Sequence, residues 1–379
     1  MKVAYVTTYD PTDVLNWSGV GTYIARALQS QGITLEPVIV RQEPFFPIAK
    51  AHARNIAARL FSGKRYLVRR SPEILRSYAQ QVQSALHRHP VDLVFSPGTL
   101  PISALEIDLP IAFWTDATFA SMLGFYSQYA NISGLSIQHA NRADQSALSR
   151  ASAAIYASRW AADSAIENYD VNPDLVHVVP FGPNVEWAFS PAEVERFVAA
   201  RPADHCNLLF MGVDWDRKGG DLAVAAAERL VEAGVKVRLD IVGCQPPRTL
   251  PLFARLHGFM SKQTPEGMKQ ILSLMREAHF LLLPSRAEAF GVVAVEAASV
   301  AVPTLACKVG GLAEVVRDGV TGYGFGLDAS PEEYAEKILN NLHPQVYRQL
   351  ALSAYSDYLD RLNWRTAGER AAAIIRKIG

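Results

Sequence analysis

The sequence predicts an α/β protein with two doubly wound domains. Three observations carry this prediction. The chain has 379 residues, more than one hydrophobic core normally supports. Its hydrophobic fraction of 49% is ample for two cores. Short apolar runs alternate with segments of helical spacing along the whole length, which is typical of parallel sheets covered on both faces.

The apolar runs fall into two series, one for each predicted sheet. The first series comprises Val3–Thr7, 35–40, 92–95, 111–114 and 176–179. The second comprises 208–211, 237–242, 280–283 and 304–306. Helical spacing is found at 21–31, 72–88, 158–169, 221–233, 266–277 and 345–360. Two such series predict two domains of doubly wound topology.

The joint between the domains is predicted within 179–191, where three prolines and a glycine interrupt regular structure. We therefore expect an N-terminal domain over 1–185 and a C-terminal domain over 186–362. A last helical segment, 363–379, follows another helix rather than a strand, and we expect it to return to the N-terminal domain.

Charge is balanced over the chain but uneven along it. Lys and Arg total 37, as do Asp and Glu, so a general nucleic-acid binder is not expected. Residues 41–90 nevertheless hold ten Lys or Arg against two acids, Glu43 and Glu73. Within this stretch the candidate contacts to an anionic membrane or a phosphorylated acceptor are Lys64, Arg65, Arg69 and Arg70. The alternative is an ordinary solvated helix face.

The cysteines and the apolar runs bear on the compartment. Cys206, Cys244 and Cys307 are odd in number and far apart, so neither a disulfide framework nor a metal site is expected. The first residues lack the apolar run of a signal peptide, and no stretch approaches the ~18 apolar residues of a membrane span. We expect a cytoplasmic protein, with contact to the inner face of the membrane as an option.

Two glycine-containing turns are candidate phosphate sites. Gly19 and Gly21 precede a helix, where backbone N–H groups favour an anion. Ile24 stands where a dinucleotide fingerprint needs a third small residue, so NAD is not indicated. Arg217 and Lys218 stand before two glycines at a second helix start and suit a diphosphate. The alternatives are a simple glycine turn and a solvated turn with incidental charges.

The strongest signal is a pair of glutamates after a predicted strand. Glu288 lies in the loop and Glu296 lies two turns into the next helix, with Phe290, Gly291 and Val292 at the helix start. Ligands bind at this edge in open α/β sheets. A nucleotide sugar suits the pair, because its ribose diol and its sugar hydroxyls each need a carboxylate. Alternatively, Glu288 caps the helix and Glu296 forms a surface ion pair.

These residues resemble retaining glycosyltransferase family 4. The resemblance covers most of the chain and rests on the two glutamates separated by seven residues, the EX7E motif. They lie in EAFGVVAVEA, followed by VPTLACKVGGLAEVVRDGVTGYGF. The glycine loop, the segment 178–184, Lys218-Gly219 and the terminal helix after Trp364 also resemble that family. The resemblance implies the GT-B fold, with two Rossmann-like domains facing a cleft.

The resemblance also implies roles for individual residues. Glu296 would bind the ribose and Glu288 the donor sugar. Lys218 would neutralise the leaving diphosphate. Backbone groups of Gly19 and of Phe290–Val292 would contact the diphosphate. His257 and Gly258 fall where the family recognises the base, through the backbone rather than the imidazole.

Two departures from the family pattern stand out. Val213 replaces an arginine that usually follows the strand glycine, and Arg217 is the candidate to supply that guanidinium. Thr115 replaces a histidine, which leaves Asp116 as a candidate near the reacting centre. Alternatively, Asp116 is a helix N-cap.

The resulting hypothesis is a metal-independent retaining glycosyltransferase of the hexosyltransferase type, without a cofactor. Its donor is a nucleotide-diphosphate sugar, and its acceptor is a glycan, a lipid or a small molecule. One alternative is a GT-B sugar-nucleotide epimerase or hydrolase. A second is a nucleotide-sugar-binding protein that has lost catalysis.

Overall fold

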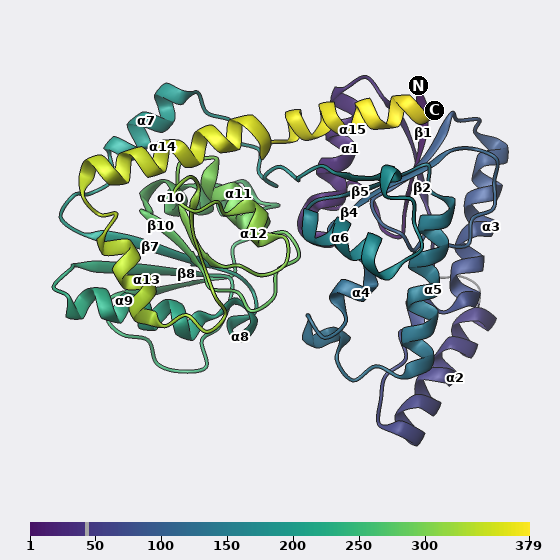
Figure 1. Ribbon diagram of the computed structural model, residues 1–379, viewed down its shortest axis with the longest axis horizontal. Coiled ribbons are helices and arrows are strands. Elements are labelled where there is room, and N and C mark those ends of the chain that lie inside the picture. Colours follow the sequence, from purple (N-terminus) through teal and green to yellow (C-terminus); the bar gives the residue numbers. More distant parts are fainter. Residues whose placement is uncertain (42–44) are drawn as a thin grey trace. The chain divides into compact units, whose positions relative to one another are not determined.

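The computed structural model describes residues 1–41 and 45–379 and divides into two compact units (Figure 1). Glu43 of the basic stretch lies outside the described residues. The N-terminal unit comprises Met1–Pro180 and Ala367–Gly379, and the C-terminal unit comprises Phe181–Thr366. Phe181 packs on Phe290 and on Trp364, with ring centroids 5.2 and 5.7 Å apart, which assigns it to the C-terminal unit. The division thus lies a few residues before the expected 185/186 boundary.

The N-terminal unit is built on a six-stranded parallel sheet in the order β2-β1-β3-β4-β5-β6. Its strands are β1 Lys2–Thr7, β2 Thr34–Ile39, β3 Leu93–Ser96, β4 Ile111–Thr115, β5 Ala153–Tyr156 and β6 Val176–Val178. Strands β3, β4 and β5 are buried throughout, as expected for a sheet with helices on both faces.

Seven α-helices of the described residues accompany this sheet: α1 Val20–Ser30, α2 Phe45–Ser62, α3 Pro72–Arg88, α4 Phe119–Met122, α5 Gly134–Arg150, α6 Arg159–Asn168 and α15 Trp364–Ile378. Single 3-10 turns are η1 Asn16–Gly19, η2 Val68–Arg70, η3 Ser127–Tyr129 and η4 Pro173–Leu175. Helix α15 approaches α1 closely, because a Cβ at Gly368 would lie 2.7 Å from the carbonyl oxygen of Ala27. Arg376 of α15 also donates to the carbonyl of Gln31.

The C-terminal unit repeats the plan with a parallel sheet in the order β12-β11-β10-β7-β8-β9. Its strands are β7 Cys206–Met211, β8 Val237–Val242, β9 Ala254–Gly258, β10 Phe280–Leu283, β11 Thr304–Cys307 and β12 Gly322–Phe325. Its helices are α7 Pro191–Ala199, α8 Trp215–Lys218, α9 Gly220–Glu232, α10 Pro265–Glu277, α11 Val292–Ala298, α12 Leu312–Val315, α13 Pro331–Leu339 and α14 Pro344–Arg361. The expected doubly wound α/β architecture is therefore confirmed in each unit.

The strand order positions the candidate site. In the C-terminal sheet the chain goes from β7 through β8 to β9 on one side, then returns through β10 to β12 on the other. The topological switch point, where open α/β sheets bind ligands, lies between the carboxyl ends of β7 and β10. The loops that follow these two strands carry Arg217, Lys218 and Glu288.

None of the helices in the described parts of the chain is long and apolar enough to cross a membrane.

Candidate functional site

Arg217 and Lys218 lie in a short helix, α8, where a loop leading into one long helix was expected. The Asp214 side chain caps α8 by accepting from the Arg217 backbone N–H over 3.0 Å. Gly219, with φ of 76°, then reverses the chain before α9 begins at Gly220. A Cβ at Gly219 would lie 2.2 Å from the Pro284 carbonyl oxygen, so only glycine allows this turn to pack on the end of β10.

The two loops at the switch point bring two cations onto one carboxylate. Lys218 donates from its ammonium group to Glu288 Oε2. Arg217 Nη1 lies 3.5 Å from the same oxygen and donates to the Ala287 carbonyl over 2.8 Å. The carboxylate of Asp214 lies 3.7 Å from Arg217 Nε on the more exposed side.

This packing contradicts the solvated-turn alternative for Lys218, whose side chain is only 9% exposed. A diphosphate that reached the cluster would compete with Glu288 for the same ammonium group. The helix-cap alternative for Glu288 is also wrong, because the N-cap of α11 is Gly291 and no side chain caps it.

Glu296 lies inside α11 and is fully buried. The ammonium group of Lys262 donates to its Oε1, while its buried Oε2 makes no side-chain hydrogen bond among the described residues. Burial raises the pKa of Glu296 above its ordinary value; Lys262 and the nearby Asn184 backbone N–H act in the opposite direction. The surface ion-pair alternative is therefore wrong, because Glu296 and its Oε2 are buried.

Lys262 is a site residue that sequence reasoning missed. It lies between β9 and α10, in a stretch without a motif, and its side chain is 29% exposed. In the sequence, Lys262 is visible only as a lone lysine two residues before Thr264, the N-cap of α10. Such a residue ordinarily indicates no more than solvent exposure.

The start of α11 offers backbone groups rather than side chains. Phe290 is buried and packs on Phe181, so its ring serves the core. Gly291 has φ of 91°, and a Cβ there would lie 2.4 Å from Leu312 Cδ1. The first N–H groups of an α-helix lack intrahelical acceptors. Ala294 donates to the Gly291 carbonyl over 2.9 Å, which leaves the N–H groups of Val292 and Val293 for other partners. Their contact with a diphosphate stays a prediction.

His257 and Gly258 form the end of the outer strand β9. The His257 imidazole Nε2 lies 2.8 Å from Asp240 Oδ1, and Asp240 also accepts from Arg238 Nε over 2.8 Å. The Gly258 carbonyl accepts from the Gly243 N–H over 2.8 Å. The imidazole is therefore engaged within the sheet, and base recognition by this backbone stays a prediction.

In the N-terminal unit, the structure requires glycine at positions 19 and 21 for different reasons. Trp17, Ser18 and Gly19 form a left-handed turn, with φ of 49°, 53° and 86°. Gly19 is the N-cap of α1 and has no side chain to close the helix start. A Cβ at Gly21 would lie 2.2 Å from Tyr9 Oη, so Gly21 permits close packing of that ring. Two non-glycine residues in left-handed conformation mark this loop as strained.

Asp116 directly follows β4 and accepts from Trp17 Nε1 over 3.2 Å. The N-cap alternative for Asp116 is wrong, because Thr118 caps α4 and accepts from the Ser121 N–H over 3.1 Å. Asp116 thus joins the β4 edge to the strained glycine loop of the same unit. Its role near a reacting centre stays a prediction.

The four basic candidates divide into two pairs. Arg70 Nη1 donates to the buried carboxylate of Asp144 over 3.1 Å, and its guanidinium lies 4.9 Å from the Phe119 ring centroid. Arg65 donates to backbone carbonyls, including that of Ala130 over 3.3 Å. Arg70 is therefore engaged inside the unit, and Arg65 is engaged by backbone carbonyls nearer the surface. Lys64 and Arg69 are exposed.

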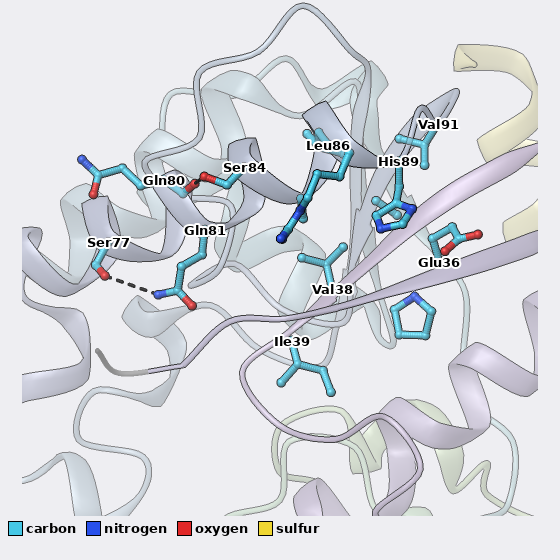
Figure 2. A pocket seen from close by; sticks show the side chains of 14 residues that line it. Glu36, Val38, Ile39, Ser77, Gln80, Gln81, Ser84, Leu86, His89 and Val91 are labelled. Carbon is cyan, nitrogen blue, oxygen red and sulfur yellow. Dashed lines mark hydrogen bonds between the residues drawn. The ribbon is translucent and has the colours of Figure 1, made fainter. Parts of the chain in front are cut away.

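A pocket of about 630 Å³ lies elsewhere, between β2 and α3 of the N-terminal unit (Figure 2). Gln81 lines it and bonds the Arg41 backbone in both directions, over 2.9 and 2.8 Å. A second pocket, of about 410 Å³, lies in the C-terminal unit beside Arg201 and Tyr347. None of the predicted site residues lines either pocket, so neither supports a donor site.

Metal-binding groups are not found in the part of the chain that the structure describes: it contains no cluster of three or more His, Cys, Asp or Glu arranged to hold a metal ion. The three cysteines are free and buried.

Sequence comparisons relate part of the C-terminal unit to a known family. Residues 205–343 match the family described as glycosyl transferases group 1. The chain is 33% identical over 230 residues to the D-inositol 3-phosphate glycosyltransferase of Acidothermus cellulolyticus, covering 56% of this chain and 50% of that protein. It is 30% identical to the same-named protein of Streptomyces bingchenggensis, with the same coverage. The chain thus spans about half the length of these curated relatives.

Solved structures extend the likeness over the whole chain. Sucrose-phosphate synthase from Thermosynechococcus elongatus superimposes with a TM-score of 0.73 at 18% identity, covering 99% of this chain and 98% of that one. Anabaena HepE in complex with UDP and glucose gives 0.65 at 17% identity, covering 99% of both chains. The protein therefore has the two-domain GT-B fold, and residues 205–343 carry the sequence features of group 1 glycosyl transferases.

Proposed function

We propose that the protein is a retaining glycosyltransferase that moves a hexose from a nucleotide-diphosphate donor to an acceptor hydroxyl without a metal ion. The observation that carries the proposal is the arrangement at the C-terminal switch point. Two cations share Glu288, and Oε2 of the fully buried Glu296 makes no side-chain hydrogen bond among the described residues. The segment that matches group 1 glycosyl transferases contains all four residues.

The chemistry assigns a task to each group. Glu296 Oε2 accepts a ribose hydroxyl, a charge-assisted bond that gains strength where water is excluded. Lys218 transfers its contact from Glu288 to the diphosphate, where negative charge grows as the glycosidic bond breaks. Glu288, released from that contact, accepts hydroxyls of the donor sugar. It acts by positioning the sugar and is not a covalent nucleophile.

Retention follows, on this proposal, from attack on the face that the diphosphate leaves. A phosphate oxygen of the departing nucleotide takes the proton of the acceptor hydroxyl, while that hydroxyl oxygen bonds to the anomeric carbon. The atoms balance without a metal or a cofactor. The free, buried cysteines support a reducing compartment, and we propose a cytoplasmic enzyme.

The test begins with the donor. A thermal-shift panel of UDP, GDP, ADP and dTDP hexoses identifies the nucleotide, because a ligand that binds the folded state raises the melting temperature. UDP-glucose is the first choice, since the solved HepE structures contain UDP and UDP-glucose. D-inositol 3-phosphate heads the acceptor panel because it names the curated relatives.

The product decides between the functions. A new glycoside with the donor's anomeric configuration, formed equally well with EDTA, supports the proposal. An inverted product, or activity abolished by EDTA and restored by a metal ion, contradicts it. An epimer or free sugar from donor alone indicates an epimerase or hydrolase. Donor binding without any turnover across the acceptor panel indicates a binding protein.

A further inference from the structure

The C-terminal end of helix α2 exposes large apolar side chains. Ile56, Leu60 and Phe61 are 58%, 76% and 89% exposed. Ile56 and Leu60, four residues apart, share one face, and Phe61 follows at the last turn. Single exposed apolar residues need no explanation, but three in the last two turns of one helix form a patch. In Figure 1, α2 extends beyond the strands of its own unit.

Exposed cations lie on the last turns of α2 and on the segment that follows it. Arg59, Lys64 and Arg69 are exposed, and none of the three makes an ion pair with the described residues. Arg69 lies in η2, which packs against α2. We call Ile56, Arg59, Leu60, Phe61, Lys64 and Arg69 the α2 tip.

The first half of the same helix is different. Lys50 and Arg54 both pair with Glu73 of α3, over 3.2 and 2.6 Å. Arg54 holds the pKa of Glu73 down to about 2. Among the described residues, Lys50 and Arg54 of α2 are therefore paired with an acid, whereas Arg59 near the end of the helix is not. The loop beside the tip contributes neutral groups, such as Asn131, which donates to the Gly63 carbonyl over 3.0 Å.

We propose that the α2 tip docks on the surface of an anionic lipid bilayer. Leu60 and Phe61 enter the boundary between headgroups and acyl chains, while Arg59, Lys64 and Arg69 contact lipid phosphates. An exposed apolar patch accompanied by exposed cations is the composition that binds such an interface. A second copy of this chain fits less well, because a symmetric contact would set the same cations against each other.

The experiment is co-sedimentation of the full chain with vesicles of phosphatidylcholine alone or with 30% phosphatidylglycerol. We expect binding to the anionic vesicles only, weakened by salt. The triple variant Arg59→Gln, Lys64→Gln, Arg69→Gln should lower the partition coefficient about a hundredfold at low salt, since each cation near the surface contributes roughly fivefold. Leu60→Ser with Phe61→Ser should lower it at least tenfold.

Matched controls lie on the C-terminal unit. Leu252 is as exposed as any residue of the tip, so Leu252→Ser tests whether any exposed apolar residue has this effect. The triple variant Lys236→Gln, Arg248→Gln, Arg348→Gln removes three exposed cations that pair with acids. Both control variants should bind like wild type.

Three results overturn the proposal. The first is that wild-type protein does not bind anionic vesicles. Equal losses in the control and tip variants show a general charge or solubility effect. A concentration-dependent dimer in sedimentation velocity that Leu60→Ser with Phe61→Ser abolishes assigns the patch to self-association. Circular dichroism of every variant establishes that the fold is intact.

Discussion

Glu288 and Glu296 are the same residue type eight positions apart, yet their surroundings differ. Glu288 is partly exposed and meets Lys218 and Arg217 at the switch point. Glu296 is fully buried, accepts from Lys262, lies near the Asn184 backbone N–H, and has a pKa raised by that burial. One carboxylate is part of a charge cluster, and the other is a buried hydrogen-bond acceptor.

This difference indicates whether each residue affects the free energy of the transition state or that of ligand binding. A group in a charge cluster affects the transition state, where charge moves. A buried acceptor affects ligand binding equally in the ground and transition states and therefore changes affinity. Substitutions in each region should consequently alter different kinetic constants.

The largest effect is expected for Lys218→Ala. The departing diphosphate loses its ammonium partner, so kcat should fall about a hundred- to thousandfold while the donor KM changes less. Steady-state kinetics with saturating acceptor measure both constants. A folded variant with near-normal kcat would remove Lys218 from the reaction.

Glu296→Ala should weaken donor binding about tenfold or more. A buried hydrogen bond to a charged group contributes ~1.5–3 kcal/mol, and the ribose diol would lose its acceptor. Isothermal titration with the donor gives the affinity, and circular dichroism establishes folding. Unchanged affinity in the folded variant contradicts the assignment.

Arg217→Ala should have an intermediate effect, about tenfold on kcat. Arg217 also donates to the Ala287 carbonyl, so part of its contribution is to position the loop that bears Glu288. Arg217→Lys should recover only part of the activity, because an ammonium group cannot reproduce a two-pronged contact. Full recovery by lysine would show that charge alone matters at this position.

The smallest effect concerns pH and stability. With a raised pKa, folded Glu296 keeps its proton as the pH rises above the ordinary carboxyl range, where the unfolded chain releases it. The unfolded state then binds fewer protons, so this residue lowers the free energy of unfolding as the pH rises. Glu296→Gln removes that dependence.

Urea denaturation between pH 4.5 and 7 measures the pH effect. The free energy of unfolding of Glu296→Gln minus that of wild type should become more positive as the pH rises. A difference that is flat or falls with pH would show that Lys262 holds Glu296 ionised throughout.

Much of the fold was predictable because branched apolar runs specify buried parallel strands. The exceptions are β5, β9 and β12. The sequences of β5 and β12, AAIY and GYGF, are rich in alanine and glycine, and that of β9, ARLHG, has a single large apolar residue. Small residues carry little apolar signal, and these strands form because neighbouring strands pair with them. Helix α8 was missed for a related reason: four residues are too few to show helical spacing.

The candidate site was predictable where function depends on spacing, as it does for the two glutamates. It was not predictable where the partner comes from a distant loop. Lys262 meets Glu296 through tertiary structure alone, and Asp144 takes Arg70 out of the basic surface in the same way. Such pairings depend on packing that a single sequence does not display.

The most direct test of the division between the two glutamates compares UDP with the UDP-sugar, or the equivalent pair for whichever nucleotide the panel selects. Calorimetry is done on wild type, Glu288→Gln and Glu296→Gln. We expect Glu296→Gln to weaken both ligands by the same factor. Glu288→Gln should leave nucleotide binding unchanged or tighter, because Lys218 is then free for the diphosphate, and should weaken only the additional contribution of the sugar. Equal losses of UDP binding in both variants, or none in Glu296→Gln, would contradict separate tasks for the two carboxylates.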